Sequence, residues 1–132
     1  MIKEKIKSEQ ECIEQIKDIC EQNKHNEICG FVGIKDDYFV LQKCENIAED
    51  KTKKFAINPV DYLIFQEENE FLFLFHSHIA GGEKPSQFDI IMSENSCLPF
   101  FIYSLTNKKS NIYVPKTHEV DVLIINRFKE CI

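Results

Sequence analysis

The run Phe71-Leu72-Phe73-Leu74-Phe75 constrains the fold of this chain more than any other segment of its sequence. All five consecutive side chains are apolar, whereas a strand with one face in water alternates apolar and polar residues. A strand that is apolar at every position is buried on both faces, so it lies in the interior of a sheet with covering layers on each side. The run therefore predicts a central strand in a layered structure of helices and strands.

Three further segments have the sequence pattern of helices. Ser8 with Glu11 three residues later is a capping box, and apolar residues recur behind it at helical spacing to about residue 23. Asn58-Pro59 predicts a second start, with asparagine as the cap and proline in the first helical position. Ser86 predicts a third start, for a helix that continues through about residue 93.

The remaining apolar segments are typical of strands. Gly30 and Gly33 inside the first of them suggest a bulge or a close approach of the backbone to another group. The predicted strands cover residues 28–34, 38–47, 71–75, 100–105, 111–114 and 120–126. We therefore expect an α/β (α+β) fold with a single mixed β-sheet flanked by helices, in one domain over residues 1–132.

Charge and hydropathy exclude two classes of partner. With 22 acidic against 16 basic residues the net charge is −6, and no stretch has the clustered Lys and Arg that phosphate binding requires, so we expect no nucleic-acid partner. No apolar run approaches the ~20 residues of a membrane span. The first ten residues, MIKEKIKSEQ, carry charges where a secretory signal needs an apolar run, so we expect a cytoplasmic protein without a membrane partner.

Six cysteines are scattered along the chain without a Cys-x-x-Cys pair. In a reducing compartment such cysteines usually pack as small buried hydrophobic residues, and the alternatives are disulfides or a second metal site. The six are Cys12, Cys20, Cys29, Cys44, Cys97 and Cys131.

The segment with the strongest chemical signal follows directly after the apolar run. Side chains in a strand alternate between its faces, so His76 and His78 project to the same side. Asp89 lies in the first turn of the next predicted helix, after a loop that contains Gly81-Gly82. Two imidazole nitrogens and one carboxylate oxygen suit zinc and leave a fourth position open for water, as in catalytic rather than structural sites. We predict a zinc site formed by His76, His78 and Asp89.

These residues resemble the signature of the JAMM metalloproteases, also called MPN-domain proteins. That signature is His-x-His, seven residues, Ser, two residues and Asp, and it is filled here by His76, His78, Ser86 and Asp89. The likeness extends upstream to residues 26–31, Asn-Glu-Ile-Cys-Gly-Phe, and downstream to residues 98–104. The chain is similar to the small prokaryotic and phage-type members in particular.

The resemblance implies a fold, a cofactor and roles for two more residues. The fold is the cytidine-deaminase-like sandwich of the family, and the cofactor is Zn²⁺. Glu27 would be the general base that takes a proton from water and passes it to the leaving amine, and Ser86 would donate its hydroxyl to the oxyanion. Many members have proline after the second histidine where this chain has Ile79, which predicts an altered loop and an intact metal site.

The implied activity is the hydrolysis of a peptide or isopeptide bond. Its substrate would be a protein or peptide with an extended tail, such as the C-terminal tail of a ubiquitin-like or sulfur-carrier protein. A peptidase associated with phage tail assembly or with the cell wall, and a non-catalytic MPN scaffold, are the alternatives. A nucleobase deaminase is excluded, because it requires a Cys-x-x-Cys that this chain lacks.

Two of the proposed site residues also have ordinary structural explanations. Serine at the start of a helix routinely caps it, so Ser86 would be present without any catalytic role. Asp89 in the first turn would equally stabilise the positive end of the helix dipole. These explanations do not exclude the chemical roles, because one side chain can cap a helix and bind a ligand.

Overall fold

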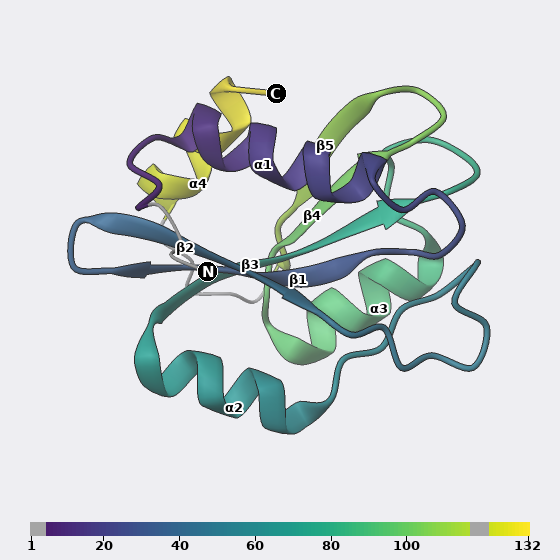
Figure 1. Cartoon of the computed structure of the whole chain (residues 1–132), viewed down its shortest axis with the longest axis horizontal. Helices are drawn as coiled ribbons and strands as arrows, with labels where there is room; N and C mark the ends of the chain where they lie inside the picture. Colours follow the sequence, from purple (N-terminus) through teal and green to yellow (C-terminus); the bar gives the residue numbers. More distant parts are fainter. Residues whose placement is uncertain (1–4, 117–121) are drawn as a thin grey trace.

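The computed structural model describes residues 5–116 and 122–132, which form a mixture of helices and strands (Figure 1). In chain order the elements are α1 (Glu9–Glu21), β1 (Cys29–Lys35), β2 (Tyr38–Cys44), α2 (Pro59–Glu68), β3 (Glu70–His78), α3 (Gln87–Ser96), β4 (Phe100–Ser104), β5 (Lys109–Tyr113) and α4 (Val122–Glu130). Ser8, Asn58 and Ser86 cap α1, α2 and α3, as the sequence predicts.

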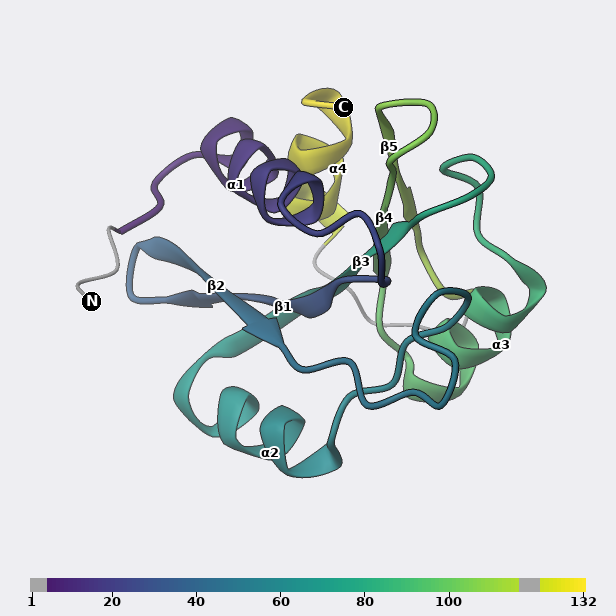
Figure 2. The same cartoon turned by 45° about the vertical axis from the view of Figure 1, so that its right-hand side comes forward.

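The five strands form one mixed sheet in the order β2-β1-β3-β4-β5. Only β3 and β4 run parallel, and the other neighbouring pairs are antiparallel. Helices α1 and α4 cover one face of this sheet, and α2 and α3 lie on the other side (Figures 1 and 2). The predicted fold class is confirmed, and the apolar run lies in the central strand, β3, where both faces are covered.

The two glycines of β1 allow the backbones of β2 and β3 to come close to it. A Cβ atom on Gly30 would lie 2.2 Å from the Gln42 carbonyl oxygen, and one on Gly33 would lie 2.6 Å from the Glu70 carbonyl oxygen. The β1–β3 register also shifts between Val32 and Gly33, which is the bulge that the sequence suggests. At the other end of this pair Cys29 lies opposite His76, so the register, continued by two residues, brings Glu27 alongside His78.

Two apolar clusters fill the spaces between the sheet and its helices. The larger lies under α1 and α4 and includes Ile13, Phe73 and Phe128, all 0% exposed. The smaller lies on the α2 side, where Phe65 packs against Phe31 with ring centroids 5.2 Å apart. Within the described residues, none of the helices combines the length and the apolar character that crossing a bilayer requires.

All six cysteines are free thiols. Burial raises the pKa values of the Cys12, Cys20 and Cys29 thiols to about 12 and that of Cys44 to about 11. Cys97 is exposed. The prediction of buried, hydrophobic cysteines is therefore confirmed for four positions.

One predicted strand is wrong. The segment 120–126 was expected as a closing strand, but residues 122–130 form α4, while residues 117–121 lie outside the described residues. The run Val122-Leu123-Ile124-Ile125 is apolar and three of its four residues are β-branched, which is typical of a strand, yet Val122 and Leu123 are 61% and 73% exposed. Ile125 and Phe128 are the buried pair, at a spacing of three that only a helix brings to one face.

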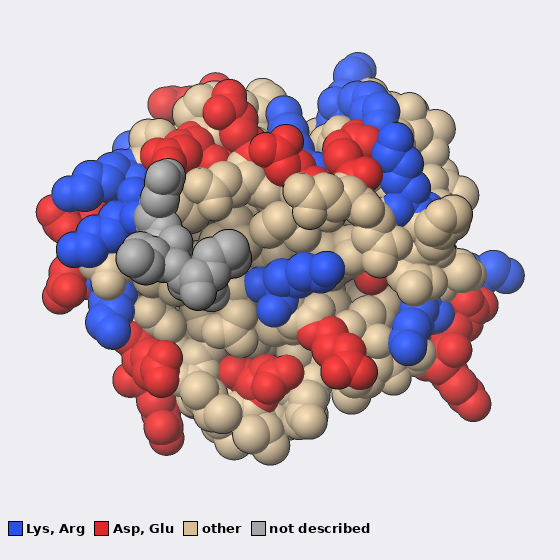
Figure 3. Space-filling view, in the orientation of Figure 1, with Lys and Arg blue, Asp and Glu red and all other residues tan. Residues whose placement is uncertain are grey.

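Charged side chains of both signs are interspersed on the face seen in Figure 3. On that face the acidic side chains therefore form no single patch, although the whole chain has a net charge of −6.

Candidate metal centre

The three predicted metal ligands converge where β3 ends and α3 begins. His76 and His78 lie on the same face of β3, and Asp89 is the third residue of α3. A capping box fixes the carboxylate, because the Ser86 amide donates to Asp89 Oδ2 at 2.9 Å and the Asp89 amide donates to Ser86 Oγ at 3.1 Å. The cap thus aims Asp89 at the end of β3.

The ligand atoms lie at the separations that one small cation requires. His76 Nε2 lies 3.2 Å from His78 Nε2 and 3.2 Å from Asp89 Oδ1, and His78 Nε2 lies 2.9 Å from Asp89 Oδ2. A tetrahedral zinc ion with bonds of ~2.0–2.1 Å separates its ligand atoms by roughly 3.3 Å. Among the described residues these three form the single group of histidine, cysteine and acidic side chains that could hold a metal ion, and they fit zinc.

Different contacts orient the two imidazole rings. His78 Nδ1 lies 2.9 Å from the Gly82 carbonyl oxygen, so this nitrogen carries the proton and Nε2 presents its lone pair to the site. His76 has no hydrogen-bond partner for Nδ1 among the residues that the structure describes. Its ring is instead stacked on Phe55, with centroids 4.5 Å apart and planes at 29°, and it meets Phe100 edge-on at 5.6 Å.

The electrostatic environment keeps Asp89 ionised. Burial opposes ionisation, but hydrogen bonds with His76 and His78 and with the Ser86 amide outweigh it and hold the pKa of Asp89 well below its usual range. Complete burial lowers the pKa of His76, which favours the neutral imidazole that binds a metal. Burial also acts to lower the pKa of His78, but its contacts with Asp89 and the Gly82 carbonyl raise it overall.

Glu27 lies beside this group and is 6% exposed. Burial raises the pKa of its carboxyl to about 7; the proximity of His78 counters this shift and the negative charges of Asp89 and Asp50 add to it. A carboxyl group with such a pKa exchanges protons readily near neutral pH. The predicted general base is therefore placed beside the predicted metal ligands.

The backbone around Glu27 is held on three sides. Its amide donates to the Lys51 carbonyl oxygen at 2.7 Å, and its carbonyl accepts from Asn46 Nδ2 at 2.9 Å. The next amide, of Ile28, donates at 2.8 Å to the Oγ of Ser77, the residue between the two histidines. The positions of Glu27 and of the histidines are therefore coupled directly.

Sequence reasoning missed Asn46, whose side chain uses its whole hydrogen-bonding capacity. Its Nδ2 also donates to the Lys54 carbonyl oxygen at 3.0 Å, and its Oδ1 accepts from the amides of Ala48 and Ala56 at 3.0 and 3.1 Å. Asn46 thus ties Glu27 to the loop of residues 48–56. The only signal in the sequence is an asparagine near the end of the predicted strand 38–47, where such residues often bond to backbone groups.

Ser77 and Phe55 were missed for different reasons. Ser77 is the variable position of His-x-His, and its 0% exposure is visible only in the packed structure. Phe55, 5% exposed, follows the charged stretch of residues 51–54. A lone aromatic residue at the end of a polar loop indicates burial, but the sequence does not identify the side chain that it packs against.

A hollow of about 330 Å³ opens onto these groups. Glu27, His78, Ser86 and Asp89 lie in its wall together with residues of the loops 52–55 and 80–84. Lys54 Nζ lies 5.3 Å from the centre of the Phe88 ring, which connects the first loop to the start of α3. All five predicted site residues thus lie together, with His76 behind the hollow and 0% exposed.

The loop after His78 is held by the turn between β4 and β5. Thr106 Oγ1 donates to the Ile79 carbonyl oxygen at 3.1 Å, and Ser104 Oγ donates to the Gly81 carbonyl oxygen at 2.8 Å. Gly81 has a φ of +86°, which favours glycine. The loop is thus fixed without proline at position 79, and the three ligand atoms still converge.

Comparisons with known proteins agree with this geometry. The model of a family described as prokaryotic homologs of the JAB domain matches residues 9–118. A protein from Desulfitobacterium hafniense with a known solution structure superposes with a TM-score of 0.64 at 21% identity, over 83% of this chain and 90% of that one. A JAB1/MPN domain protein from Archaeoglobus fulgidus superposes with a TM-score of 0.53 at 15% identity, over 90% and 96% of the two chains. At these identities the two structures show the fold alone.

A curated relative is similar over part of the chain. The tail tip assembly protein K of Escherichia phage N15 is 28% identical over 78 residues, which are 59% of this chain. The match spans 32% of the length of that relative.

Proposed function

The chain belongs to the family of prokaryotic homologs of the JAB domain, and from this membership and its metal centre we propose that it is a zinc-dependent hydrolase of peptide or isopeptide bonds. The observation that carries the proposal is the convergence of His76, His78 and Asp89 with a buried Glu27 in one hollow. The three metal ligands leave a position for water but supply no group that takes its proton. A proton-exchanging carboxyl group beside them is what hydrolysis requires.

His76, His78 and Asp89 would hold the metal, each through one atom. Zinc bound there would supply Lewis-acid polarisation of the substrate carbonyl and of the attacking water. The His78 Nδ1 contact with Gly82 and the stacking of His76 on Phe55 hold both Nε2 atoms toward the same point. Both imidazole rings are therefore oriented before a metal binds, so little conformational entropy would be lost on binding.

Glu27 would move the proton that the reaction transfers. Water adds its oxygen to the carbonyl carbon, and one of its protons passes to a Glu27 carboxylate oxygen. When the bond between carbon and nitrogen breaks, Glu27 returns this proton to the leaving nitrogen, so the carboxylate is regenerated. A pKa of about 7 suits both halves of this exchange near neutral pH.

Ser86 would stabilise the oxyanion. Its Oγ accepts the Asp89 amide proton at 3.1 Å, which leaves the hydroxyl hydrogen free to be donated. A hydroxyl in the wall of the hollow would donate it to the carbonyl oxygen of the substrate as that oxygen gains negative charge. The capping role and the catalytic role use different parts of the same group.

The substrate would be a protein or peptide with an extended tail. Glu27 and His78 lie in the wall of a hollow of about 330 Å³ between the loops 52–55 and 80–84, and a space of this size suits a single extended strand better than a folded surface. The C-terminal tail of a ubiquitin-like or sulfur-carrier protein has this form. The second candidate, a peptidase associated with phage tail assembly or the cell wall, is favoured by the similarity to the tail tip assembly protein of phage N15.

Metal analysis and cleavage assays on matched variants test the proposal. We expect about one zinc per chain in the wild type, loss of zinc and activity in His78→Ala, and retained zinc with a loss of at least ~100-fold in rate in Glu27→Gln. His25→Ala changes an exposed histidine and serves as the control. The substrates are a ubiquitin-like domain with a Gly-Gly tail fused to a reporter, and short cell-wall peptides.

Each outcome of these assays has a defined meaning. Equal zinc in the wild type and His78→Ala would contradict the metal site. Zinc binding without cleavage of either substrate would favour a non-catalytic scaffold. Cleavage of the cell-wall peptides alone would favour the second candidate over the first.

A further inference from the structure

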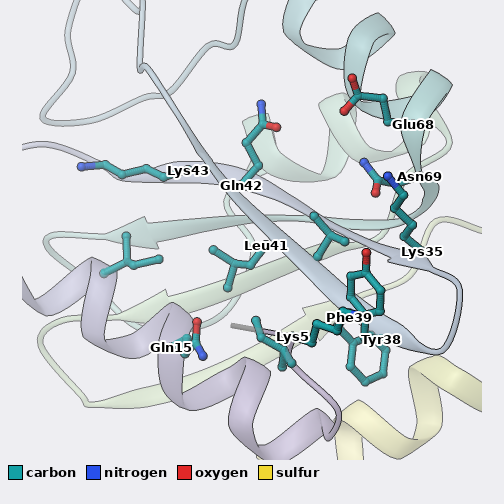
Figure 4. Close-up of a pocket in the computed structure, with 13 residues that line it drawn as sticks. Lys5, Gln15, Lys35, Tyr38, Phe39, Leu41, Gln42, Lys43, Glu68 and Asn69 are labelled. Carbon is teal, nitrogen blue, oxygen red and sulfur yellow. The ribbon is translucent and has the colours of Figure 1, made fainter. Parts of the chain in front are cut away.

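A second hollow, of about 710 Å³, lies along β2 and shares no lining residue with the hollow at the metal centre. Its floor is the outer edge of β2, which is an edge strand of the sheet (Figure 4). Gln15 and Ile19 of α1 border it on one side, and Glu68 at the end of α2 borders it on the other. We call this hollow the β2 groove.

The backbone at the floor of the β2 groove is ready to pair with another strand. The Phe39 amide points outward and donates to the Ile6 carbonyl oxygen at 2.7 Å, which forms an isolated antiparallel bridge. Successive residues of a strand point their backbone N–H and C=O groups in opposite directions. The backbone groups of Leu41 and Lys43 therefore point outward, as those of Phe39 do. On the outer edge of β2, opposite β1, Ile6 is the only described residue that pairs with it. The edge therefore accepts a strand at one position and offers further positions along its length.

Positive charge lies at both ends of the β2 groove. Lys43 is exposed at one end, and Lys5 and Lys35 are exposed at the other, with Lys5 lying 4.9 Å from the centre of the Tyr38 ring. Glu68 is the only acidic residue among those that line the groove. This balance is opposite to that of the whole chain, whose net charge is −6. Between the charged ends, Ile19 and Leu41 make the α1 side apolar.

The charges also decide between two occupants. A second copy of this chain would pair antiparallel about a two-fold axis, which brings Lys43 of one copy to the Lys5 and Lys35 end of the other. Like charges facing each other across paired strands are unfavourable. An extended segment with acidic side chains meets the same lysines with favourable charge.

We propose that the β2 groove is a docking site where an extended acidic segment of a partner protein adds a strand to the edge of β2. The seven residues of β2 span roughly 20 Å, so a partner segment of about six residues reaches both cationic ends. Its acidic residues lie beside Lys43 and beside Lys5 and Lys35, and its apolar residues face Ile19 and Leu41. This docking goes beyond the proposed hydrolysis and does not depend on it.

Binding of designed peptides to the full chain tests the proposal. The probe is a fluorescent eight-residue peptide of alternating valine and threonine with aspartate at both ends, followed by fluorescence anisotropy. We expect it to bind, and we expect the same peptide ending in lysines to bind at least about tenfold more weakly. Lys43→Glu weakens binding of the aspartate peptide by about tenfold, whereas Lys109→Glu, the same change on the opposite edge strand β5, leaves it within about twofold.

Two further measurements separate strand addition from simple charge attraction. N-methylation of the peptide amides that face β2 abolishes binding, whereas methylation of the alternate amides preserves it. Saturating peptide slows hydrogen exchange of the Leu41 and Lys43 amides. The Glu27→Gln variant binds as the wild type does, so the result stands apart from the outcome of the cleavage assays.

Three results would overturn the proposal. These are equal binding of the aspartate and lysine peptides, equal effects of the two methylation patterns, and unchanged exchange at Leu41 and Lys43 under saturating peptide. Sedimentation of the free chain as a dimer in which exchange of the Leu41 and Lys43 amides is already slow would instead assign the edge to a second copy.

Discussion

The hollow at the metal centre and the β2 groove differ in the parts of the chain that form them. The metal centre consists of side-chain atoms of β3 and α3 that lie 2.9–3.2 Å from one another, with Glu27 from the segment before β1 in the same hollow. The β2 groove follows the backbone of one edge strand and has exposed lysines at its ends. The first needs particular residues at particular distances. The second needs only an exposed strand and a favourable charge.

This difference predicts how each region tolerates substitution. Removal of one buried side chain near the metal centre alters the position of its neighbours, because interiors are close-packed. Substitution of an exposed lysine in the groove leaves the backbone edge in place. The two regions also lie on different elements, so a variant that damages one is expected to spare the other.

The largest expected effect is that of Phe55→Ala. Phe55 is 5% exposed and stacks on His76, so truncation leaves a cavity against the ring and is expected to lower the free energy of unfolding by about 3–5 kcal/mol. Urea denaturation measures this loss, and zinc titration is expected to show weaker binding. Binding of the aspartate peptide to the β2 groove should remain unchanged at temperatures where the variant is folded.

Phe88→Ala is the matched control for this variant. Phe88 also lines the metal-centre hollow but is 36% exposed, so its loss is expected to be about 1 kcal/mol or less. Equal losses for Phe55→Ala and Phe88→Ala would contradict the role assigned to stacking on His76.

An intermediate effect is expected for Asn46→Ala. The substitution removes the partner of the Glu27 and Lys54 carbonyl groups and of two loop amides, so we expect a loss of about 1–3 kcal/mol in stability. A displaced Glu27 is expected to lower kcat by up to about 100-fold with little change in KM or zinc content. Steady-state kinetics on the substrate identified by the cleavage assays, together with metal analysis, measure these quantities.

Asn46→Asp separates positioning from folding. Aspartate keeps the acceptor for the Ala48 and Ala56 amides but lacks the donors to Glu27 and Lys54, so it should recover part of the stability and little of kcat. Full recovery of kcat in Asn46→Asp would mean that the bond to the Glu27 carbonyl does not position the base.

The smallest expected effect is at Glu21, the last residue of α1. Its carboxylate accepts hydrogen bonds from Lys108 Nζ and Tyr103 Oη, both at 2.6 Å, and these bonds lower its pKa to about 2. Because the folded pKa is below the unfolded value, this stabilisation is complete above about pH 4.5 and is lost as the pH falls toward 2. With the side chain 29% exposed, Glu21→Gln is expected to cost about 1 kcal/mol at pH 7.

Denaturation at several pH values measures this effect. The difference between the wild type and Glu21→Gln should shrink below pH 4.5 and vanish near pH 2, while zinc binding at pH 7 stays unchanged. A difference that does not vary with pH would show that the carboxylate charge is not responsible. Loss of zinc in this variant would contradict the independence of the two regions, since it would show that a change on the α1 side of the sheet affects the metal centre.

Most of the metal centre could be predicted from the sequence because it depends on the geometry of one strand and of one helix start. His76 and His78 share a face because strand side chains alternate with a period of two, and Asp89 is aimed at them because Ser86 starts a capped helix. The fold class was predicted in the same way from the apolar run of β3. The segment 120–126 was predicted wrongly, because four consecutive apolar residues suit a strand and a buried helix equally.

By itself the sequence determined which residue types follow one another in each strand and helix, and with them the central strand and the same-face histidines. Only the tertiary structure decided that Glu27 lies beside His78, because this depends on the register in which Cys29 pairs with His76 across 46 intervening residues. It likewise decided that Asn46 holds Glu27 and that Ile6 is the only described residue paired with the outer edge of β2. Short-range periodicity follows from backbone geometry, whereas the contacts between distant segments follow from how the packed sheet aligns its strands.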